Sequence, residues 1–220
     1  MTTAPAFSPS ISLLGEAAAC LQLPPPIPGA AQARLVAMGE RLRRSGRYSD
    51  VVPGWGNLTV VFDPLALNGD TVLAELTAEW EASPAQPPAA RERVLKVHYG
   101  GAHGPDLPAL AAHAGLSEAE VVALHAGAAY RVAFVGFQPG FAYLSGLPAS
   151  LHMPRRAEPR TRVPPGSVAI GGAQTGVYPA ASPGGWQLIG QTDQCLFDPA
   201  ADEPSWLQPG DVVRFEVAGV

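Results

Sequence analysis

The chain has 220 residues, 47% of them hydrophobic and 15% charged, and its formal net charge is −5 at pH 7. This composition indicates a globular protein with a sizeable core, and the negative charge argues against a nucleic-acid partner. No apolar run is long enough to cross a bilayer, and residues 1–20 lack a secretory signal pattern, so we expect a cytoplasmic protein that contacts no membrane.

The first ninety residues alternate between strand and helix patterns. Short runs of apolar residues bounded by glycine or proline predict strands at residues 10–15, 18–23, 48–54 and 57–64. Apolar residues at helical spacing predict helices at 30–46 and 69–83. The three prolines within residues 82–90 then indicate a domain boundary, so we expect a small α+β domain at 1–90 and a second domain at 91–220.

The second part opens with a strand at 91–100, followed by helices at 106–115 and 116–127. The second helix begins with Ser117 and Glu120 in the S-x-x-E pattern of a capping box. The rest of the sequence shows no further helix pattern. β-like runs between glycine- and proline-rich turns, typical of a barrel or sandwich, are expected at 129–137, 163–172, 176–180, 185–192, 194–199 and 210–217.

Residues 171–192, GGAQTGVYPAASPGGWQLIGQT, combine six glycines with large apolar residues. The apolar residues exclude a flexible linker, which leaves an anion cradle or a wall of tight turns. The run 171–176 has the glycine spacing of a phosphate-binding loop, but Val177 occupies the lysine position. Because Lys96 is the only lysine in the sequence, any anion recognition must rest on arginines and backbone N–H groups.

An arginine cluster lies just before this segment, in MPRRAEPRTRVPPGS at residues 153–167. Arg155, Arg156 and Arg160 lie among prolines that restrict the backbone, so they are able to present rigid guanidinium groups to a carboxylate or phosphate. The alternative is a solvated basic loop whose charge is balanced by Glu158.

The histidines offer candidates for polar chemistry but not for metal binding. His98 and His103 lie on either side of the turn YGGAHGPD, where they either share a pocket with Asp106 or are surface residues. His125 ends the capped helix, where a cation suits the helix dipole, and structural and functional roles are both open. No histidine or cysteine has the spacing of metal ligands, so no metal site is expected.

Three motifs together carry a family resemblance: GFQPGFAYLSGLP at 136–148, PRRAEPRTRVPPGSVAIGGAQTGVYP at 154–179 and SPGGWQLIGQT at 182–192. They resemble the signature of the B-subunit family of 5-oxoprolinase, which is related to KipI-type kinase inhibitors and to subunit 1 of the allophanate hydrolase/urea carboxylase system. The similarity continues upstream through VHYGGAHGPDL at 97–107 and reaches VVPGWGNLTVVFDP at 51–64. It therefore covers nearly the whole chain.

The resemblance implies a fold and an activity. The fold is a small α+β N-terminal domain followed by a cyclophilin-like β-barrel. The activity is an ATP-hydrolysing amide-bond hydrolase that converts 5-oxo-L-proline to L-glutamate and requires three different chains, the A, B and C subunits, with B inactive alone and paired directly with C. Phosphorylation of the lactam carbonyl oxygen would make a leaving group and needs positive charge near the reaction. ATP and Mg²⁺ are expected in the assembled complex, with neither certain on this chain.

The resemblance also suggests which residues form a site. A pocket facing the C subunit would be lined by Gln174, Thr175, Tyr178 and Trp186. Arg155, Arg156 and Arg160 would bring positive charge to its rim. His98 and His125 are the candidates for acid–base or orienting roles.

Two other functions fit the same family resemblance. One is a carboxyltransferase subunit of an allophanate hydrolase/urea carboxylase system, and the other is a KipI-like inhibitor that docks on a histidine kinase. A concave site with convergent polar groups favours an enzyme subunit, whereas an exposed apolar patch without such groups favours the inhibitor.

Overall fold

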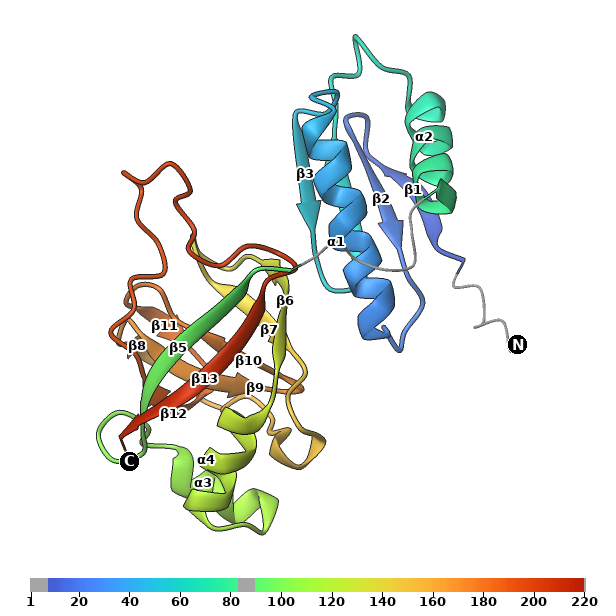
Figure 1. Ribbon diagram of the computed structural model, residues 1–220. Helices are drawn as coiled ribbons and strands as arrows, with labels where there is room; N and C mark the ends of the chain where they lie inside the picture. Colours follow the sequence, from blue (N-terminus) through green and yellow to red (C-terminus); the bar gives the residue numbers. More distant parts are fainter. Residues whose placement is uncertain (1–7, 83–89, 220) are drawn as a thin grey trace. The chain divides into compact units, whose positions relative to one another are not determined.

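The computed structural model describes residues 8–82 and 90–219, and the chain divides into two compact units, residues 1–89 and 90–220 (Figure 1). The proline-rich segment predicted to mark the domain boundary, 82–90, lies almost entirely outside the described residues. Within the described ranges, no helix combines the length and apolar character needed to span a membrane.

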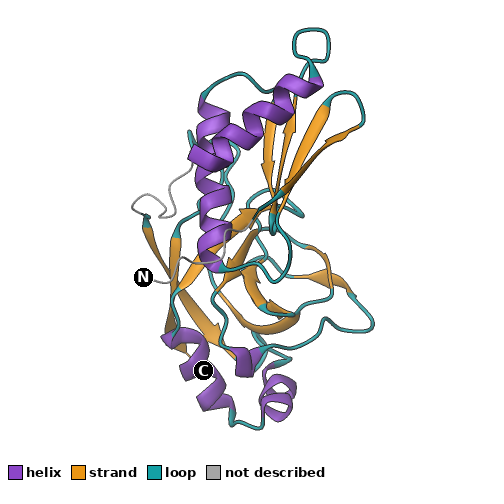
Figure 2. Ribbon diagram, turned by 90° about the vertical axis from the view of Figure 1, so that its right-hand side faces the viewer, coloured by secondary structure: helices purple, strands orange, loops and turns teal. Residues whose placement is uncertain are grey.

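The N-terminal unit is an antiparallel sheet of order β1-β2-β4-β3 with both of its helices on one side (Figure 2). Its elements are β1 (Ser10–Leu14), β2 (Ala18–Gln22), α1 (Gly29–Arg44), β3 (Asp50–Pro53), β4 (Asn57–Val61) and α2 (Gly69–Ala82). These elements confirm the strands and helices predicted from the sequence, with ends that differ by a few residues.

The helices of this unit are held to the sheet by the apolar faces that the sequence predicts. Leu35 and Met38 of α1 and Leu76 of α2 are fully buried in one core with Leu21 and Leu58 of the central strands. Burial of side chains of this size contributes roughly 1.5–3 kcal/mol each, so this contact accounts for the docking of both helices.

The C-terminal unit is a closed barrel of strand order β10-β7-β6-β13-β5-β12-β9, which confirms the predicted β-barrel. Its strands are β5 (Glu92–Tyr99), β6 (Tyr130–Val135), β7 (Ala142–Ser145), β9 (Ser167–Gly171), β10 (Gln174–Val177), β12 (Gln187–Gln191) and β13 (Val212–Gly219). β5 and β13 pair in parallel and the other neighbours are antiparallel. A separate ribbon consists of β8 (Arg160–Val163) and β11 (Ser182–Gly184).

Side chains fill the barrel, and two helices lie at one end of it. Strand β5 alternates between buried and exposed residues, with Leu95, Val97 and Tyr99 inside, as period-two patterning requires. Helices α3 (Leu107–Ala114) and α4 (Glu118–Gly127) lie together at one end of the barrel (Figure 1). The predicted capping box is confirmed, because Ser117 Oγ accepts from the Glu120 N–H while the Glu120 carboxylate accepts from the Ser117 N–H.

Three predictions about residues 139–199 need correction. Residues 194–199 do not form a strand, since only an isolated bridge joins Phe197 to Ser205. Strand β7 lies in the aromatic stretch and β8 in the arginine cluster, where no strand was predicted. The segment 171–192 is not a wall of tight turns, because β10, β11 and β12 lie within it; the runs expected at 163–172 and 185–192 are confirmed as β9 and β12, whereas β10 begins before the predicted 176–180.

Candidate functional site

The aromatic residues of the C-terminal unit form a second core on the outside of the barrel. Along β9 and β12, Ile170 and Ile189 belong to the interior core, whereas Ala169 and Leu188 belong to a separate cluster. We call this cluster the outer core; its buried members are Phe141, Val163, Ala169, Tyr178, Trp186 and Leu188, with Tyr143 packed against them. Alternation along the strands therefore gives this part of the barrel two apolar faces.

The glycines of residues 171–192 make room for these aromatic rings. A Cβ on Gly171 would lie 2.5 Å from the indole of Trp186, and one on Gly176 would lie 3.3 Å from the same ring. A Cβ on Gly184 would collide with the hydroxyl of Tyr178. The glycines thus allow aromatic side chains of this chain itself to approach the backbone closely.

Phe137 stands at the edge of the outer core on strained backbone. It is the only described non-glycine residue with positive φ, at 71°, and its side chain is 62% exposed. Its ring packs edge-on against Phe141 and Tyr178, with centroid distances of 5.4 and 6.3 Å. A bulky residue in this backbone region costs on the order of 1–3 kcal/mol, and such strain clusters at functional sites.

Arg156 and Arg160 are bound to a buried carboxylate. Asp106 Oδ1 accepts from Arg160 Nη2 at 2.8 Å and from Arg156 Nη1 at 3.3 Å, while Oδ2 accepts from the Leu188 N–H at 2.7 Å. Asp106 therefore serves the arginine cluster, and its side chain makes no described contact with His98 or His103. The loop of 153–167 is neither fully solvated nor free, because one carboxylate fixes two of its guanidinium groups.

Arg155 remains exposed, and no ion-pair partner for it lies within the described part of the chain. Its guanidinium carbon lies 5.8 Å from the centre of the Trp186 ring, within the range of a cation–π contact. Burial raises the pKa of the Tyr143 hydroxyl and that of Tyr178, and the nearby charge of Arg155 opposes the rise at both. One cation thus approaches two tyrosine hydroxyls at the edge of the outer core.

We call this surface the aromatic–arginine face. It is defined by Phe134, Phe137, Phe141, Tyr143, Arg155, Arg156, Arg160, Tyr178 and Trp186. The half-buried rings of Phe134 and Tyr143 stack with a centroid distance of 4.2 Å. The face therefore combines one exposed ring, Phe137, and the half-buried rings of Phe134 and Tyr143 with positive charge, over the buried rings of the outer core. Such a composition suits binding of a small acid or a partner chain.

His125 lies inside the barrel and is fully buried. Its Nδ1 is 2.8 Å from the hydroxyl of Tyr99 and its Nε2 is 3.0 Å from Thr175 Oγ1. Because Thr175 donates its own proton to the carbonyl of Ala169, Nε2 carries the ring proton and Nδ1 accepts from Tyr99. Burial lowers the pKa of His125 to about 3, so the imidazole is neutral and joins α4 to the strands.

The other predicted site residues are placed apart from one another. Thr175 is buried with His125 inside the barrel, whereas Tyr178 and Trp186 belong to the outer core. Gln174 is half-buried at the start of β10, and its side-chain nitrogen lacks a described partner. His98 is exposed, with its ring centroid 5.6 Å from that of His103, whose Nδ1 lies 2.9 Å from Gln191 Oε1.

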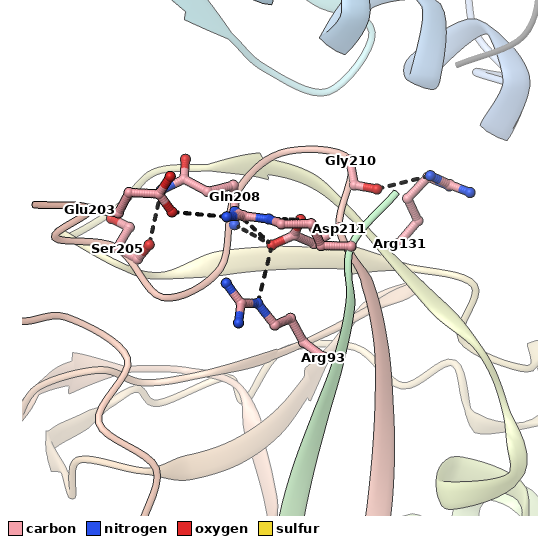
Figure 3. A network of polar contacts seen from close by, with 8 residues as sticks. Arg93, Arg131, Glu203, Ser205, Gln208, Gly210 and Asp211 are labelled. Atoms are coloured by element: carbon pink, nitrogen blue, oxygen red, sulfur yellow. Dashed lines mark hydrogen bonds and ion pairs between the residues drawn. The ribbon is translucent and has the colours of Figure 1, made fainter. Parts of the chain in front are cut away.

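Sequence reasoning missed a polar network at the end of the barrel where β5 begins. Figure 3 shows Arg93, Gln208 and Asp211 converging there. The buried carboxylate of Asp211 lies 3.1 Å from Arg91 Nε and 3.9 Å from Arg93 Nε, and it accepts from the Gln208 N–H at 3.0 Å. More than a hundred residues separate the arginines from Asp211 along the chain, so no local sequence motif could have predicted the network.

Among the described residues, no group of three or more histidine, cysteine, aspartate or glutamate side chains could hold a metal ion.

The two-unit architecture and this face define a class of protein. The family model for the carboxyltransferase domain, subdomain C and D, matches residues 9–207. Within that class the chain belongs to the B-subunit family of 5-oxoprolinase, which confirms the resemblance drawn from its motifs.

Sequence relatives extend over almost the whole chain. It is 53% identical to the 5-oxoprolinase B subunit of Escherichia coli O157:H7, over 92% of this chain and 93% of the relative. Identity to the 5-oxoprolinase B subunit of Haemophilus influenzae is 44%, over 94% of this chain and 97% of the relative. Both comparisons therefore extend over nearly the full length of the relatives.

Solved structures share the fold. The crystal structure of TTHA0988 superposes with a TM-score of 0.80 at 37% identity, covering 92% of this chain and 40% of that one. The urea carboxylase of Kluyveromyces lactis superposes with a TM-score of 0.77 at 17% identity, covering 98% of this chain and 22% of that one. This chain thus spans less than half the length of both solved proteins.

Proposed function

We propose that the chain is the B subunit of an ATP-consuming 5-oxoprolinase, an amide-bond hydrolase that opens the lactam of 5-oxo-L-proline to give L-glutamate. The observation that carries this proposal is sequence similarity, over nearly the whole length, to proteins named as the 5-oxoprolinase B subunit. The identity reaches 53% over 92% of this chain. The C subunit is the proposed direct partner, and the A subunit is the third component of the enzyme. We place the complex in the cytoplasm. We also propose that this chain is inactive alone and that its barrel is of the cyclophilin-like type.

The glycine-rich segment 171–177 does not offer a phosphate-binding loop for ATP. Val177 stands where a phosphate-binding loop needs lysine. Gly171 and Gly176 take part in the ladder between β9 and β10 and lie against Trp186, so the segment offers no open cradle of N–H groups. We therefore propose that ATP and Mg²⁺ bind elsewhere in the assembled complex, and we assign no step through them to this chain.

The proposed contribution of this chain is to bind and orient the substrate. Arg155 offers an exposed cation, and the aromatic edges of Phe137 and Tyr143 offer an apolar surface for a small ring. A partner that covered this face would exclude water and strengthen the interaction of arginine with a bound anion. No described hydrogen bond or ring contact joins His98 or His125 to the face, so we assign proton transfer to neither.

Reconstitution tests the proposal. This chain is co-expressed with its C partner, the A subunit is added, and glutamate formation and ATP hydrolysis are followed with and without 5-oxo-L-proline. Leaving out each component in turn is the control. The proposal requires glutamate to form only when this chain is present, and glutamate formed equally well without it would refute the proposal.

The carboxyltransferase alternative is supported by the family model and by the fold shared with urea carboxylase. It predicts a stable complex with the C partner that transfers a carboxyl group and shows no turnover with 5-oxo-L-proline. The KipI-like alternative predicts docking on a histidine kinase without either activity. The reconstituted complex separates the first two functions, and a binding assay with a histidine kinase tests the third.

A further inference from the structure

Two polar atoms of the β8–β11 ribbon are buried without a hydrogen-bond partner. They are Nη1 of Arg160 and Oγ of Ser182, and neither finds a partner anywhere in the described residues. Native proteins rarely leave such atoms unsatisfied, because a buried polar group without a partner is unfavourable. A bound ligand that satisfies both atoms would explain their position.

Both atoms border the outer core. In the ribbon, Ser182 pairs with Val163, which belongs to the outer core. Arg160 pairs with Gly184, and the Tyr178 hydroxyl packs directly on Gly184. Residues that face each other on paired strands share one side of the ribbon. The register shifts between these two pairs, so the ribbon brings Arg160 and Ser182 onto neighbouring pairs, and the charge of Arg160 acts on the Tyr178 hydroxyl.

The charge at this place is positive. Arg155 and Arg160 both act electrostatically on the Tyr178 hydroxyl. Burial raises the pKa of this hydroxyl, and a hydrogen bond with the Trp186 backbone and the two cations oppose the rise. Asp106 supplies one negative charge to Arg156 and Arg160 together. Three guanidinium groups against one buried carboxylate leave an excess of positive charge, and an anion is the ligand that would balance it.

We propose that Arg160 Nη1, Ser182 Oγ and the guanidinium of Arg155 form a binding site for the carboxylate of a small cyclic acid. Asp106 is the positioning residue, because its bond to Nη2 holds Arg160 with Nη1 free. The ring of the acid lies against the exposed ring of Phe137 and the half-buried ring of Tyr143. That the acid is 5-oxo-L-proline rests on the proposed function; a phosphate group is the other source of the same oxyanion chemistry.

Binding to the complex of this chain with its C partner tests the site. Calorimetric titrations use 5-oxo-L-proline, 2-pyrrolidinone and inorganic phosphate in turn. Since 2-pyrrolidinone has the same lactam ring without the carboxylate, the site predicts that it binds at least about 10-fold more weakly than 5-oxo-L-proline. Equal affinity for the two lactams would overturn the proposal.

Substitutions then locate the site. Arg160→Gln and Ser182→Ala are each expected to weaken binding of 5-oxo-L-proline, by roughly 10- to 100-fold for the arginine. Arg214→Gln is the matched charge control, because Arg214 is an exposed arginine on the same barrel that pairs with Glu92. Wild-type affinity in both Arg160→Gln and Ser182→Ala, or an equal loss in Arg214→Gln, would contradict the proposal.

Ser182→Ala also separates binding from folding. The substitution removes a buried hydroxyl that makes no hydrogen bond within the described residues, so the midpoint of urea unfolding is expected to stay the same or rise while binding weakens. A structural role for Ser182 would instead lower the midpoint. This variant keeps the test decisive even if Arg160→Gln does not fold.

The outcomes also separate the site from the proposed function. Specific binding of 5-oxo-L-proline without glutamate formation in the reconstituted enzyme would support the site and refute the oxoprolinase function. Glutamate formation that is unaffected by both substitutions would support the function and overturn the site. If phosphate alone binds and the same variants weaken it, the oxyanion site stands but its assignment to the carboxylate of a cyclic acid is overturned.

Discussion

Acidification should destabilise the barrel through His125. The imidazole is fully buried and neutral, and burial lowers its pKa to about 3. In the unfolded chain the same group has a pKa of about 6.5. Between these two values the unfolded state binds one proton more than the folded state, so the free energy of unfolding falls as the pH falls.

The size of the effect follows from the two pKa values. Each pH unit below about 6.5 removes roughly 1.4 kcal/mol from the free energy of unfolding. Between pH 7.5 and pH 5.0, His125 therefore accounts for a loss of about 2 kcal/mol. This is a large fraction of the roughly 5–15 kcal/mol that is typical of a folded domain.

Urea titration at the two pH values, followed by NMR signals of barrel amides, measures the loss in the C-terminal unit separately. His125→Gln provides the comparison, because an amide can still donate to Thr175 but does not titrate. This variant is expected to be less stable at pH 7.5, by about 1–3 kcal/mol, and to lose about 2 kcal/mol less than wild type on acidification. His113→Gln, at an exposed site on α3, is the control and should keep the wild-type pH dependence.

Equal losses of unfolding free energy by wild type and His125→Gln between pH 7.5 and pH 5.0 would contradict this role of His125. So would an NMR titration of the folded protein in which His125 gains its proton near pH 6.5. Either result would mean that the hydrogen bonds to Tyr99 and Thr175 do not hold the neutral imidazole in the barrel.

Three further perturbations test other parts of the structure. Gly171→Ala should lower the free energy of unfolding by about 1–3 kcal/mol, measured by chemical denaturation, because its methyl group would overlap the indole of Trp186. Gly127→Ala is the control and should not destabilise the protein, because the space around Gly127 is open. Asp211→Asn should cost about 1–3 kcal/mol in the same assay, since it weakens the hydrogen bonds from Arg91 and the ion pair with Arg93 at a buried carboxylate. Phe137→Gly should change stability by less than about 1 kcal/mol, because relief of strain offsets lost packing, yet should lower oxoproline turnover in the reconstituted enzyme; unchanged turnover would remove Phe137 from the working surface.

The sequence itself predicted elements that depend on neighbouring residues. Ser117 and Glu120 form a capping box because both bonds lie within one helical turn. The alternation of β5 is visible in RVLKVHY because every second side chain of a strand faces the same side of the sheet. The motifs of the second half also identified the family, since three long motifs in one order are far more specific than any one of them.

The candidate site was only partly predictable. The arginines and aromatic residues were identified by type, but their partners were not. Of the two interpretations of His98 and His103, the surface one is confirmed, because both are exposed and Asp106 instead binds Arg156 and Arg160, which lie 50 and 54 residues further along the chain. The pairing needs β12 to bring Leu188 beside Asp106, and that proximity exists only after the barrel has closed.

Local sequence thus determined the helices, most strands, the apolar periodicity and the family of this protein, because each of these depends on residues within a few positions or on a characteristic run of them. Only the tertiary structure decided what the glycines of 171–192 are for and that Thr175 faces inward while Trp186 lies outside. The physical reason is that a strand has two faces, and which face meets the interior, an aromatic ring or a buried arginine is set by strands distant in sequence.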